Sequence, residues 1–281
     1  MKIYNYKHFS LIRLATKTIL LAMVVLAIYA LAAYAYTRLH LRPITPLVSP
    51  SQLTAQTDWR PGAFSYIHQV NERQRMLRKS QRFNGFEIDT YTLPNDPTIY
   101  VAHDPSQFKY KMTLQAAFSI PKDPQKAFFW IDMKTSLTQA QIDDVKKIAA
   151  FCGVPLENLI FEPPYKDPAQ AKLLSQNGLH VILFITGFYK ENLSTEQTQA
   201  LVDKINRQIE EIHPLALASG MGNYPYLKAY FPQYYKAVCY NTTKRPSLKK
   251  HFMRSLMRQD PTVIMYLTDE YNWDNWRTKH D

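Results

Sequence analysis

Apolar and polar residues follow two periods along most of this chain. Short apolar runs, which predict strands, occupy residues 63–67, 85–90, 128–133, 159–162, 180–185, 215–219, 237–241 and 262–267. Segments with the 3.6-residue period of helices lie between them, at residues 72–83, 113–118, 138–151, 167–177, 195–212, 225–231 and 247–258. Strands that alternate with helices predict an α/β fold with a parallel sheet. Two architectures fit this pattern, a closed (β/α)8 TIM barrel and a doubly wound open sheet.

Polar residues at the ends of the predicted strands favour the barrel. In barrel enzymes the functional side chains lie at the C-terminal ends of several strands. Such side chains occur here at or near those ends: His68, Glu87, Asp89, Asp132, Lys134, Glu162 and Asn241. The insert at residues 93–104 has the pattern of a hairpin, which would carry His103 over the same end of the sheet. We therefore expect a (β/α)8 barrel.

The most apolar segment lies near the N-terminus. Residues 18–37 contain no charged residue, and about twenty such residues can span a bilayer. Lys2, Lys7, Arg13 and Lys17 precede this segment, so the positive-inside rule keeps the N-terminus cytoplasmic and exports the rest. We expect a basic cytoplasmic N-terminus at 1–17, a transmembrane signal anchor at 18–37, a linker at 38–61 and the barrel at 62–281.

A cleaved signal peptide is the alternative to an anchor. Ala33-Tyr34-Ala35 has the small-x-small form of a cleavage site. The apolar segment is long for a signal peptide, however, and its tyrosines suit a membrane interface. We therefore expect a membrane-anchored protein with an exported domain. In a bacterium, that domain would face the periplasm from the inner membrane.

Composition narrows the classes of function. The formal net charge is +11, but the first 42 residues hold six Lys and Arg and no acid, which leaves an ordinary excess of +5. Two further basic groups lie on predicted helices that we expect to face solvent: Arg75, Arg78, Lys79 and Arg82, and Lys249, Lys250, Arg254 and Arg258. No base-reading motif accompanies them, so we expect no nucleic-acid partner. The two cysteines, Cys152 and Cys239, are too few for a disulfide framework, and we expect buried free thiols.

The residue types at the strand ends suit phosphoryl chemistry. Glu87 and Asp89 lie two residues apart on one strand and so share a face, and Asp132 and Lys134 repeat that spacing. Three carboxylates are hard oxygen ligands, which predicts one divalent cation, Mg²⁺ or Ca²⁺. His68 and His103 could divide the work of general base and general acid, and Lys134 could bind a phosphate oxygen. Each group taken alone also fits a solvated sheet edge, a rim histidine or a surface salt bridge.

Other polar residues could support this site. Asn71 could orient His68 or cap the helix that begins near Glu72, and we expect the cap, because Asn is a strong N-cap residue. Glu162 could hold a base or add a ligand, and a rim salt bridge fits it equally well. Asp104 beside His103 is a further supporting candidate. Asn241 could meet substrate, although we expect a rim position.

These motifs resemble those of the phosphatidylinositol phospholipase C-like barrel phosphodiesterases. His68, then Glu87-Ile88-Asp89, then His103-Asp104 resembles the signature of glycerophosphodiester phosphodiesterases. Those enzymes usually have Arg after the first His and Glu-x-Lys on the third strand, where this chain has Gln69 and Asp132-Met133-Lys134. At both positions the chain resembles the sphingomyelinase D-type phospholipases. Their His-x-Val-Asn motif is matched by His68-Gln69-Val70-Asn71, and their Asp-x-Lys by Asp132-Met133-Lys134. Menorin-type proteins resemble the chain through the same His, Glu-x-Asp and later His.

The resemblance implies a role for each matched residue. It implies His68 and His103 as the acid/base pair, metal ligation by Glu87, Asp89 and Asp132, and phosphate binding by Lys134. In that superfamily a substrate hydroxyl often attacks phosphorus and forms a cyclic phosphate. The membrane segment adds the expectation of a lipid-derived phosphodiester as substrate. Two rivals stay open: a non-catalytic barrel that binds a phosphorylated ligand or serves as an envelope scaffold, and a glycosidase-type hydrolase that uses Glu87 and Glu162.

Overall fold

The computed structural model describes residues 3–55, 64–106, 112–188, 193–239 and 248–268 of the 281-residue chain. The strands are β1 (Phe64–Ile67), β2 (Gly85–Thr92), β3 (Ile99–Val101), β4 (Phe128–Met133), β5 (Leu159–Glu162), β6 (His180–Phe184), β7 (Ala216–Gly220), β8 (Lys236–Cys239) and β9 (Val263–Thr268). The helices are α1 (Ile3–His40), α2 (Arg73–Lys79), α3 (Leu114–Phe118), α4 (Gln139–Cys152), α5 (Pro168–Gln176), α6 (Thr195–Ile212), α7 (Tyr224–Tyr230) and α8 (Leu248–Arg258). Short 3-10 turns precede β4 and β5 at Pro124–Lys126 and Leu156–Asn158.

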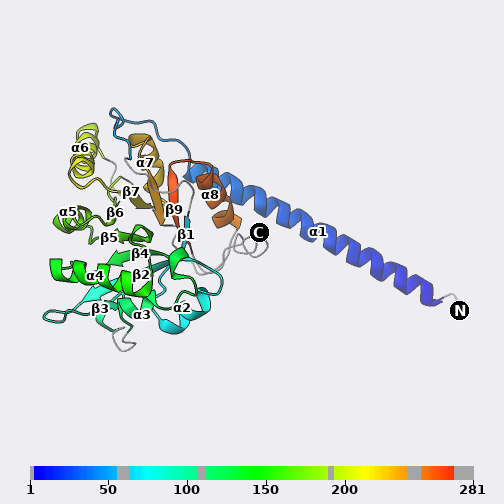
Figure 1. Ribbon diagram of the computed structural model, residues 1–281. Coiled ribbons are helices and arrows are strands. Elements are labelled where there is room, and N and C mark those ends of the chain that lie inside the picture. Colours follow the sequence, from blue (N-terminus) through cyan, green and yellow to red (C-terminus); the bar gives the residue numbers. More distant parts are fainter. Residues whose placement is uncertain (1–2, 56–63, 107–111, 189–192, 240–247, 269–281) are drawn as a thin grey trace.

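Eight parallel strands among the described residues close into a barrel with helices around it (Figure 1). Their order is β1-β9-β8-β7-β6-β5-β4-β2, and β1 pairs with both β9 and β2. That closure confirms the predicted (β/α)8 barrel and excludes the open sheet. The remaining strand, β3, pairs antiparallel with β2, with Thr90 opposite Val101, and so confirms the predicted hairpin.

Local sequence explains where the longer helices begin and end. Thr138 and Gln141 form a reciprocal capping box at the start of α4, and Ser194 and Gln197 do the same for α6. Gly153 ends α4 in the left-handed conformation, with φ of 72°, which glycine adopts without steric cost. These short-range signals fix the helix boundaries independently of the barrel.

The inside of the barrel is filled by one set of alternating strand side chains. Its buried members include Tyr66, Trp130, Ile160, Ile182, Ala218, Ala237 and Met265. Burying an aromatic or branched side chain of this size stabilises a fold by about 1.5–3 kcal/mol. Because side chains alternate, the residue two positions later on each strand also points inward, one layer nearer the C-terminal end. That next layer lies at the end of the barrel where barrel enzymes carry their functional side chains.

Helix α1 extends well beyond the barrel and meets it at α8 (Figure 1). Its segment Arg13–His40 is the one helix among the described residues that is long and apolar enough to cross a membrane. Residues 41–55 then follow the barrel surface, where the Ser51 amide donates to the Tyr230 carbonyl at 2.7 Å. The Leu47 amide donates to the Tyr230 hydroxyl at 3.1 Å. Residues 47–51 of the predicted linker therefore lie against α7, whereas residues 38–40 belong to α1.

Two expectations about individual side chains were wrong. Lys79 and Arg254, which we expected on solvent-facing helix surfaces, are buried, because each lies on the side of its helix that packs toward the barrel. Cys152 and Cys239 are free thiols as expected, but both are partly exposed rather than buried. Cys239 ends β8 and faces the barrel mouth, whereas Cys152 ends α4 beside Ser119.

Candidate active site

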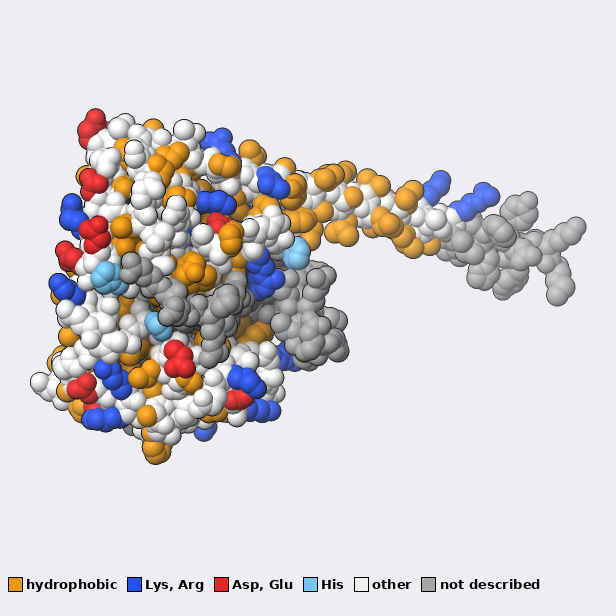
Figure 2. Space-filling model, turned by 45° about the horizontal axis from the view of Figure 1, so that its top comes forward, with side chains coloured by type: hydrophobic (Ala, Val, Ile, Leu, Met, Phe, Trp, Pro, Cys, Tyr) orange, Lys and Arg blue, Asp and Glu red, His pale blue; other side chains and the backbone are white. Residues whose placement is uncertain are grey.

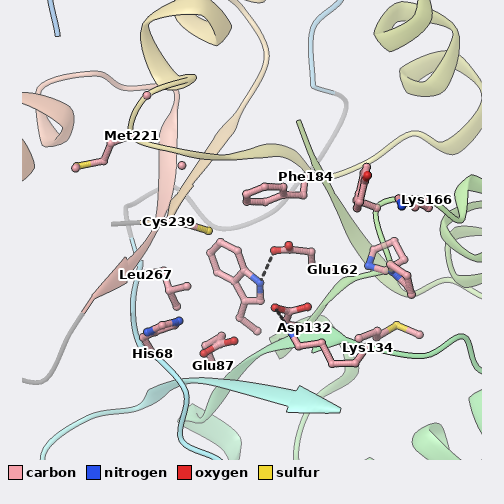
Figure 3. Close-up of a pocket in the computed structure, with 17 residues that line it drawn as sticks. His68, Glu87, Asp132, Lys134, Glu162, Lys166, Phe184, Met221, Cys239 and Leu267 are labelled. Atoms are coloured by element: carbon pink, nitrogen blue, oxygen red, sulfur yellow. Dashed lines mark hydrogen bonds and ion pairs between the residues drawn. The ribbon is translucent and has the colours of Figure 1, made fainter. Parts of the chain in front are cut away.

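A cavity of about 820 Å³ opens at the C-terminal ends of the barrel strands (Figure 3). The upper layer of inward side chains forms its wall, with loop residues added at the rim. The lining residues are His68, Glu87, Trp130, Asp132, Met133, Lys134, Glu162, Pro163, Pro164, Tyr165, Lys166, Phe184, Gly220, Met221, Gly222, Cys239 and Leu267. Four of the predicted strand-end residues therefore share one cavity with Lys134: His68, Glu87, Asp132 and Glu162.

Three carboxylates converge at one side of this cavity. Glu87, Asp89 and Asp132 each place an oxygen within 4.8 Å of the other two. Strand pairing causes this, because Asp89 and Asp132 are direct neighbours in the register of β2 and β4. Divalent cations bind oxygens at roughly 2.0–2.6 Å, so a single ion between these oxygens could contact all three. The donor set therefore fits the predicted hard cation.

Lys134 lies against the same carboxylates. Its ammonium is 2.7 Å from Asp89 Oδ1 and 2.5 Å from Asp132 Oδ2. Burial opposes the charged ammonium, but the two carboxylates outweigh it and raise the pKa of Lys134 above its usual value. When ionised, the three acids carry more negative charge than the single ammonium offsets. The remaining negative charge favours binding of a dication.

Burial and mutual repulsion make the carboxylates easier to protonate. Desolvation, and then the charge of Asp89, raise the pKa of Glu87 well above its ordinary value. Desolvation also raises the pKa of Asp132, although Lys134 opposes that change. A bound cation would favour the ionised forms, so cation binding and proton release are expected to be linked.

The segment after β1 holds two of the carboxylates in place. Gln69 has a positive φ of 52°. Its backbone N–H donates a hydrogen bond to a carboxylate oxygen of Glu87. The side-chain NH2 of Asn71 donates to the Asp89 carboxylate. The side-chain oxygen of Asn71, Oδ1, accepts from the Asp89 backbone N–H at 2.9 Å. The expected helix cap was therefore wrong: the N-cap of α2 is Glu72, without a side-chain hydrogen bond. Asn71 positions Asp89 instead, because a buried amide satisfies two groups there.

The two histidines occupy different places. His68 lines the cavity, and the Arg75 guanidinium donates to the His68 carbonyl at 3.0 Å. His103 follows β3, where the Ala102 amide donates to the Asp89 carbonyl at 2.9 Å. The His103 side chain is 49% exposed and lies outside the cavity wall, with Nδ1 3.7 Å from Asp104. His103 lies close enough to Asp132 to act in the direction that lowers the pKa of that carboxyl, so it stands at the rim of the carboxylate cluster.

Glu162 is held by a residue that the sequence analysis missed. The indole Nε1 of Trp130 donates to Glu162 Oε2 at 2.9 Å. Burial, followed by the charge of Asp132, raises the pKa of Glu162 to about 8. Trp130 precedes Asp132 by two residues, so strand alternation alone could have placed its side chain on the same face. Asn241, the remaining predicted site residue, lies outside the described residues.

The opposite wall of the cavity was also missed. Phe184, Gly220, Cys239 and Leu267 end β6 to β9 and line the cavity with apolar or uncharged surface. They stand at the same level of the barrel as the acids, two residues beyond the interior core on each strand. Their residue types do not indicate a functional site in the sequence. Their positions near the strand ends, two residues after an inward-facing residue, could have predicted that they face the cavity.

No protein-family model and no curated protein matches this sequence. A putative glycerophosphodiester phosphodiesterase from Galdieria sulphuraria has a similar structure, with a TM-score of 0.52 at 8% identity, over 85% of this chain and 100% of that one. An Oleispira antarctica phosphodiesterase, solved with the product sn-glycerol-3-phosphate, gives a TM-score of 0.51 at 12% identity, over 79% and 97% of the two chains.

The chain shares the barrel fold of the glycerophosphodiester phosphodiesterases. A third structure, a putative member from Silicibacter pomeroyi, gives a TM-score of 0.51 at 8% identity, over 78% of this chain and 93% of that one. Each alignment spans nearly all of the other protein.

Proposed function

We propose that this protein is a membrane-anchored, metal-dependent phosphodiesterase that cleaves a glycerophosphodiester or a phospholipid-type diester. One observation carries the proposal: the oxygens of Glu87, Asp89 and Asp132 converge within 4.8 Å, beside Lys134 and the cavity that His68 lines. Acids, a fixed ammonium and an imidazole in one barrel mouth are the groups that phosphoryl transfer requires.

The three carboxylates would hold one Mg²⁺ or Ca²⁺ ion. Bound there, the cation would neutralise charge on the phosphate oxygens. Asn71 holds Asp89 in place for this role, and the Gln69 amide does the same for Glu87. Outer partners of this kind orient ligands and strengthen metal binding.

The histidines would move the protons. One imidazole takes the proton of the attacking hydroxyl, which is either water or a hydroxyl of the substrate. The other donates a proton to the oxygen that leaves phosphorus. The Lys134 ammonium, held between two acids, supplies fixed positive charge to the phosphate. Attack by a substrate hydroxyl would give a cyclic phosphate, and attack by water would give a monoester.

Location and cavity shape support a lipid-derived substrate. Helix α1 can span a bilayer by length and composition. The uncharged wall made by Phe184, Cys239 and Leu267 can accept the less polar part of a diester. Among proteins of this fold, the Oleispira antarctica phosphodiesterase was solved with sn-glycerol-3-phosphate as its product.

Phosphorus NMR of a substrate panel tests the proposal. The full-length protein in detergent, with Mg²⁺ or Ca²⁺, would be incubated with glycerophosphocholine, glycerophosphoglycerol, lysophosphatidylcholine and sphingomyelin. We expect one of them to yield a phosphomonoester or a cyclic phosphate, and His68→Ala to abolish that signal. If every diester stays intact while one binds tightly, the barrel is a non-catalytic binding protein and the proposal is wrong.

A further inference from the structure

The apolar helix α1 has two kinds of surface. From Arg13 to Leu31 its side chains are exposed on all sides, apart from a partly covered Ala30. Ala33 and Thr37 are buried, at 7% and 0% exposure, one helical turn apart on the same face. The final turns of α1 therefore touch protein, whereas the side chains from Arg13 to Tyr29 are exposed.

Aromatic contacts fix those final turns to α8. The rings of Tyr34 and Phe252 meet edge to face with centroids 5.5 Å apart. The Lys249 ammonium lies 3.9 Å from the centroid of the Tyr36 ring. Leu41, just after α1, packs onto the apolar cluster that contains Met253 and Met257 of α8. The helix is thus seated on the barrel rather than joined to it by a free linker.

The length of the uncovered segment places the barrel close to a bilayer. Lys17 and the docked Ala33 bracket residues 18–32, which at 1.5 Å per residue span roughly 22 Å. The hydrocarbon core of a bilayer is about 30 Å thick. If α1 spans it, the junction between α1 and α8 lies no farther from the bilayer than the headgroup layer, because the uncovered segment is shorter than the core. Exposed Tyr34 and Tyr36 suit that layer.

Basic side chains gather at the same junction (Figure 2). They are Arg38, Arg42, Lys249 and Lys250. Neither α8 nor the first 57 residues of the chain contain an acidic residue. The Arg38 guanidinium hydrogen-bonds to the Tyr34 hydroxyl at 2.9 Å, so one of these cations is fixed beside the junction aromatics. Charge of one sign at headgroup depth matches anionic lipid.

The junction also lies at the functional end of the barrel. In a (β/α)8 barrel each helix begins at the end where the preceding strand finishes. Lys249 and Lys250 are in the first turn of α8, and the preceding strand β8 ends at Cys239 in the cavity wall. A headgroup contact there would hold the cavity mouth beside the bilayer surface.

We propose that Arg38, Arg42, Lys249 and Lys250 form a binding surface for anionic phospholipid headgroups, which seats the barrel mouth on the bilayer that α1 spans. This inference rests on the membrane span in the proposed function and not on phosphodiesterase chemistry. Each lysine near an anionic surface is expected to add about fivefold to the local preference for anionic lipid. The partner of this basic surface is the bilayer itself, because the surface directly follows the apolar segment of α1 that can span a bilayer.

Amine labelling of the full-length protein tests the contact. The protein would be reconstituted in phosphatidylcholine vesicles with and without phosphatidylglycerol, and acetylation of each lysine would be measured by mass spectrometry. Phosphatidylglycerol should slow the labelling of Lys249 and Lys250 severalfold, and high salt should restore it. Lys172 and Lys204 are the controls, since they are exposed on α5 and α6, on the side of the barrel away from α8 (Figure 1).

Variants give a second readout that does not depend on labelling. Phosphatidylglycerol that copurifies from mixed vesicles should fall in Lys249→Gln/Lys250→Gln and stay at the wild-type level in Lys172→Gln/Lys204→Gln. Equal labelling of Lys249 and Lys250 in both vesicles, or equal lipid recovery in both double variants, overturns the inference. Release of the chain from vesicles by alkaline carbonate also overturns the inference, because it would show that α1 does not span the bilayer. Diester cleavage measured in detergent is unaffected by either failure, so the two proposals fail separately.

Discussion

The two halves of the barrel mouth differ in chemistry although they are built alike. In the first half, β1, β2, β4 and β5 present His68, Glu87, Asp132 and Glu162 to the cavity. In the second half, β6 to β9 present Phe184, Gly220, Cys239 and Leu267 at the same level. The barrel therefore fixes positions, whereas the residue type at each position decides whether it serves chemistry or shape.

Their energetic costs differ as well. Burial and like charge raise the pKa values of Glu87 and Asp132, which means that the folded state disfavours their ionised forms. The uncharged half carries no such penalty and continues the apolar interior below it. Acids with strongly perturbed pKa values, gathered in one part of a cavity, are typical of functional sites. The comparison predicts that substitutions in the first half change catalysis, while those in the second change which diester fits.

The largest difference should come from removing the cavity imidazole. His68→Gln should lower kcat by roughly 10²- to 10⁴-fold, because proton transfer loses its partner while side-chain size is nearly kept. Leu267→Val, the matched change at the same level of the uncharged half, should alter kcat less than tenfold. Steady-state kinetics with the best diester compares the two. Similar losses in both variants would remove the functional distinction between the halves.

Loss of the Asn71 amide should weaken the metal site. Asn71→Leu removes both hydrogen bonds to Asp89 and should lower cation affinity roughly 10- to 100-fold, as measured by calorimetric titration. Asn84→Leu is the control, because Asn84 is exposed and comes just before β2, at the opposite end of that strand from Asp89. A cation affinity unchanged by Asn71→Leu would show that the amide serves folding alone.

Substitutions in the uncharged half should act on binding. Phe184→Ala removes most of one wall of the cavity and should raise KM by roughly tenfold for diesters with a bulky apolar group. The same variant should leave kcat close to the wild-type value, and a small diester should be affected least. A fall in kcat with unchanged KM would instead assign Phe184 to the chemical step.

The smallest expected effect is on stability, at Glu162 on the border between the halves. Its folded pKa of about 8 lies above the unfolded value, so the folded state holds the extra proton. The free energy of unfolding contributed by this group is therefore complete at low pH and falls as pH rises from about 4.5 to 8. In metal-free protein, Glu162→Gln should flatten part of that fall in urea titrations across the range. An unchanged slope would show that Glu162 is ionised throughout.

Periodicity predicted the fold because strand and helix signals are local. The bounds of β4, β5 and α6 agree with the predicted ranges, and Glu87, Asp89 and Asp132 meet because neighbouring parallel strands keep register. Contacts between elements were not predictable in this way. Asn71 lies where a cap would lie, yet its partner comes from β2, and no local pattern records that choice.

The two histidines and the helix junction show the same limit. His68 was expected in the cavity and lies there, whereas the place of His103 at the rim depends on how the β2–β3 hairpin folds over Asp89. Ala33 and Thr37 belong to the apolar segment by composition, and only the packing against α8 separates them from the uncovered turns.

Metal-dependent turnover tests the central claim most directly. Hydrolysis of bis(p-nitrophenyl) phosphate by the full-length protein would be followed before and after removal of divalent ions with EDTA, and again after Mg²⁺ or Ca²⁺ is returned. The account predicts that EDTA abolishes turnover, that one of the two ions restores it, and that Asp132→Asn stays inactive throughout. Turnover that survives complete metal removal, or that Asp132→Asn retains, would contradict it.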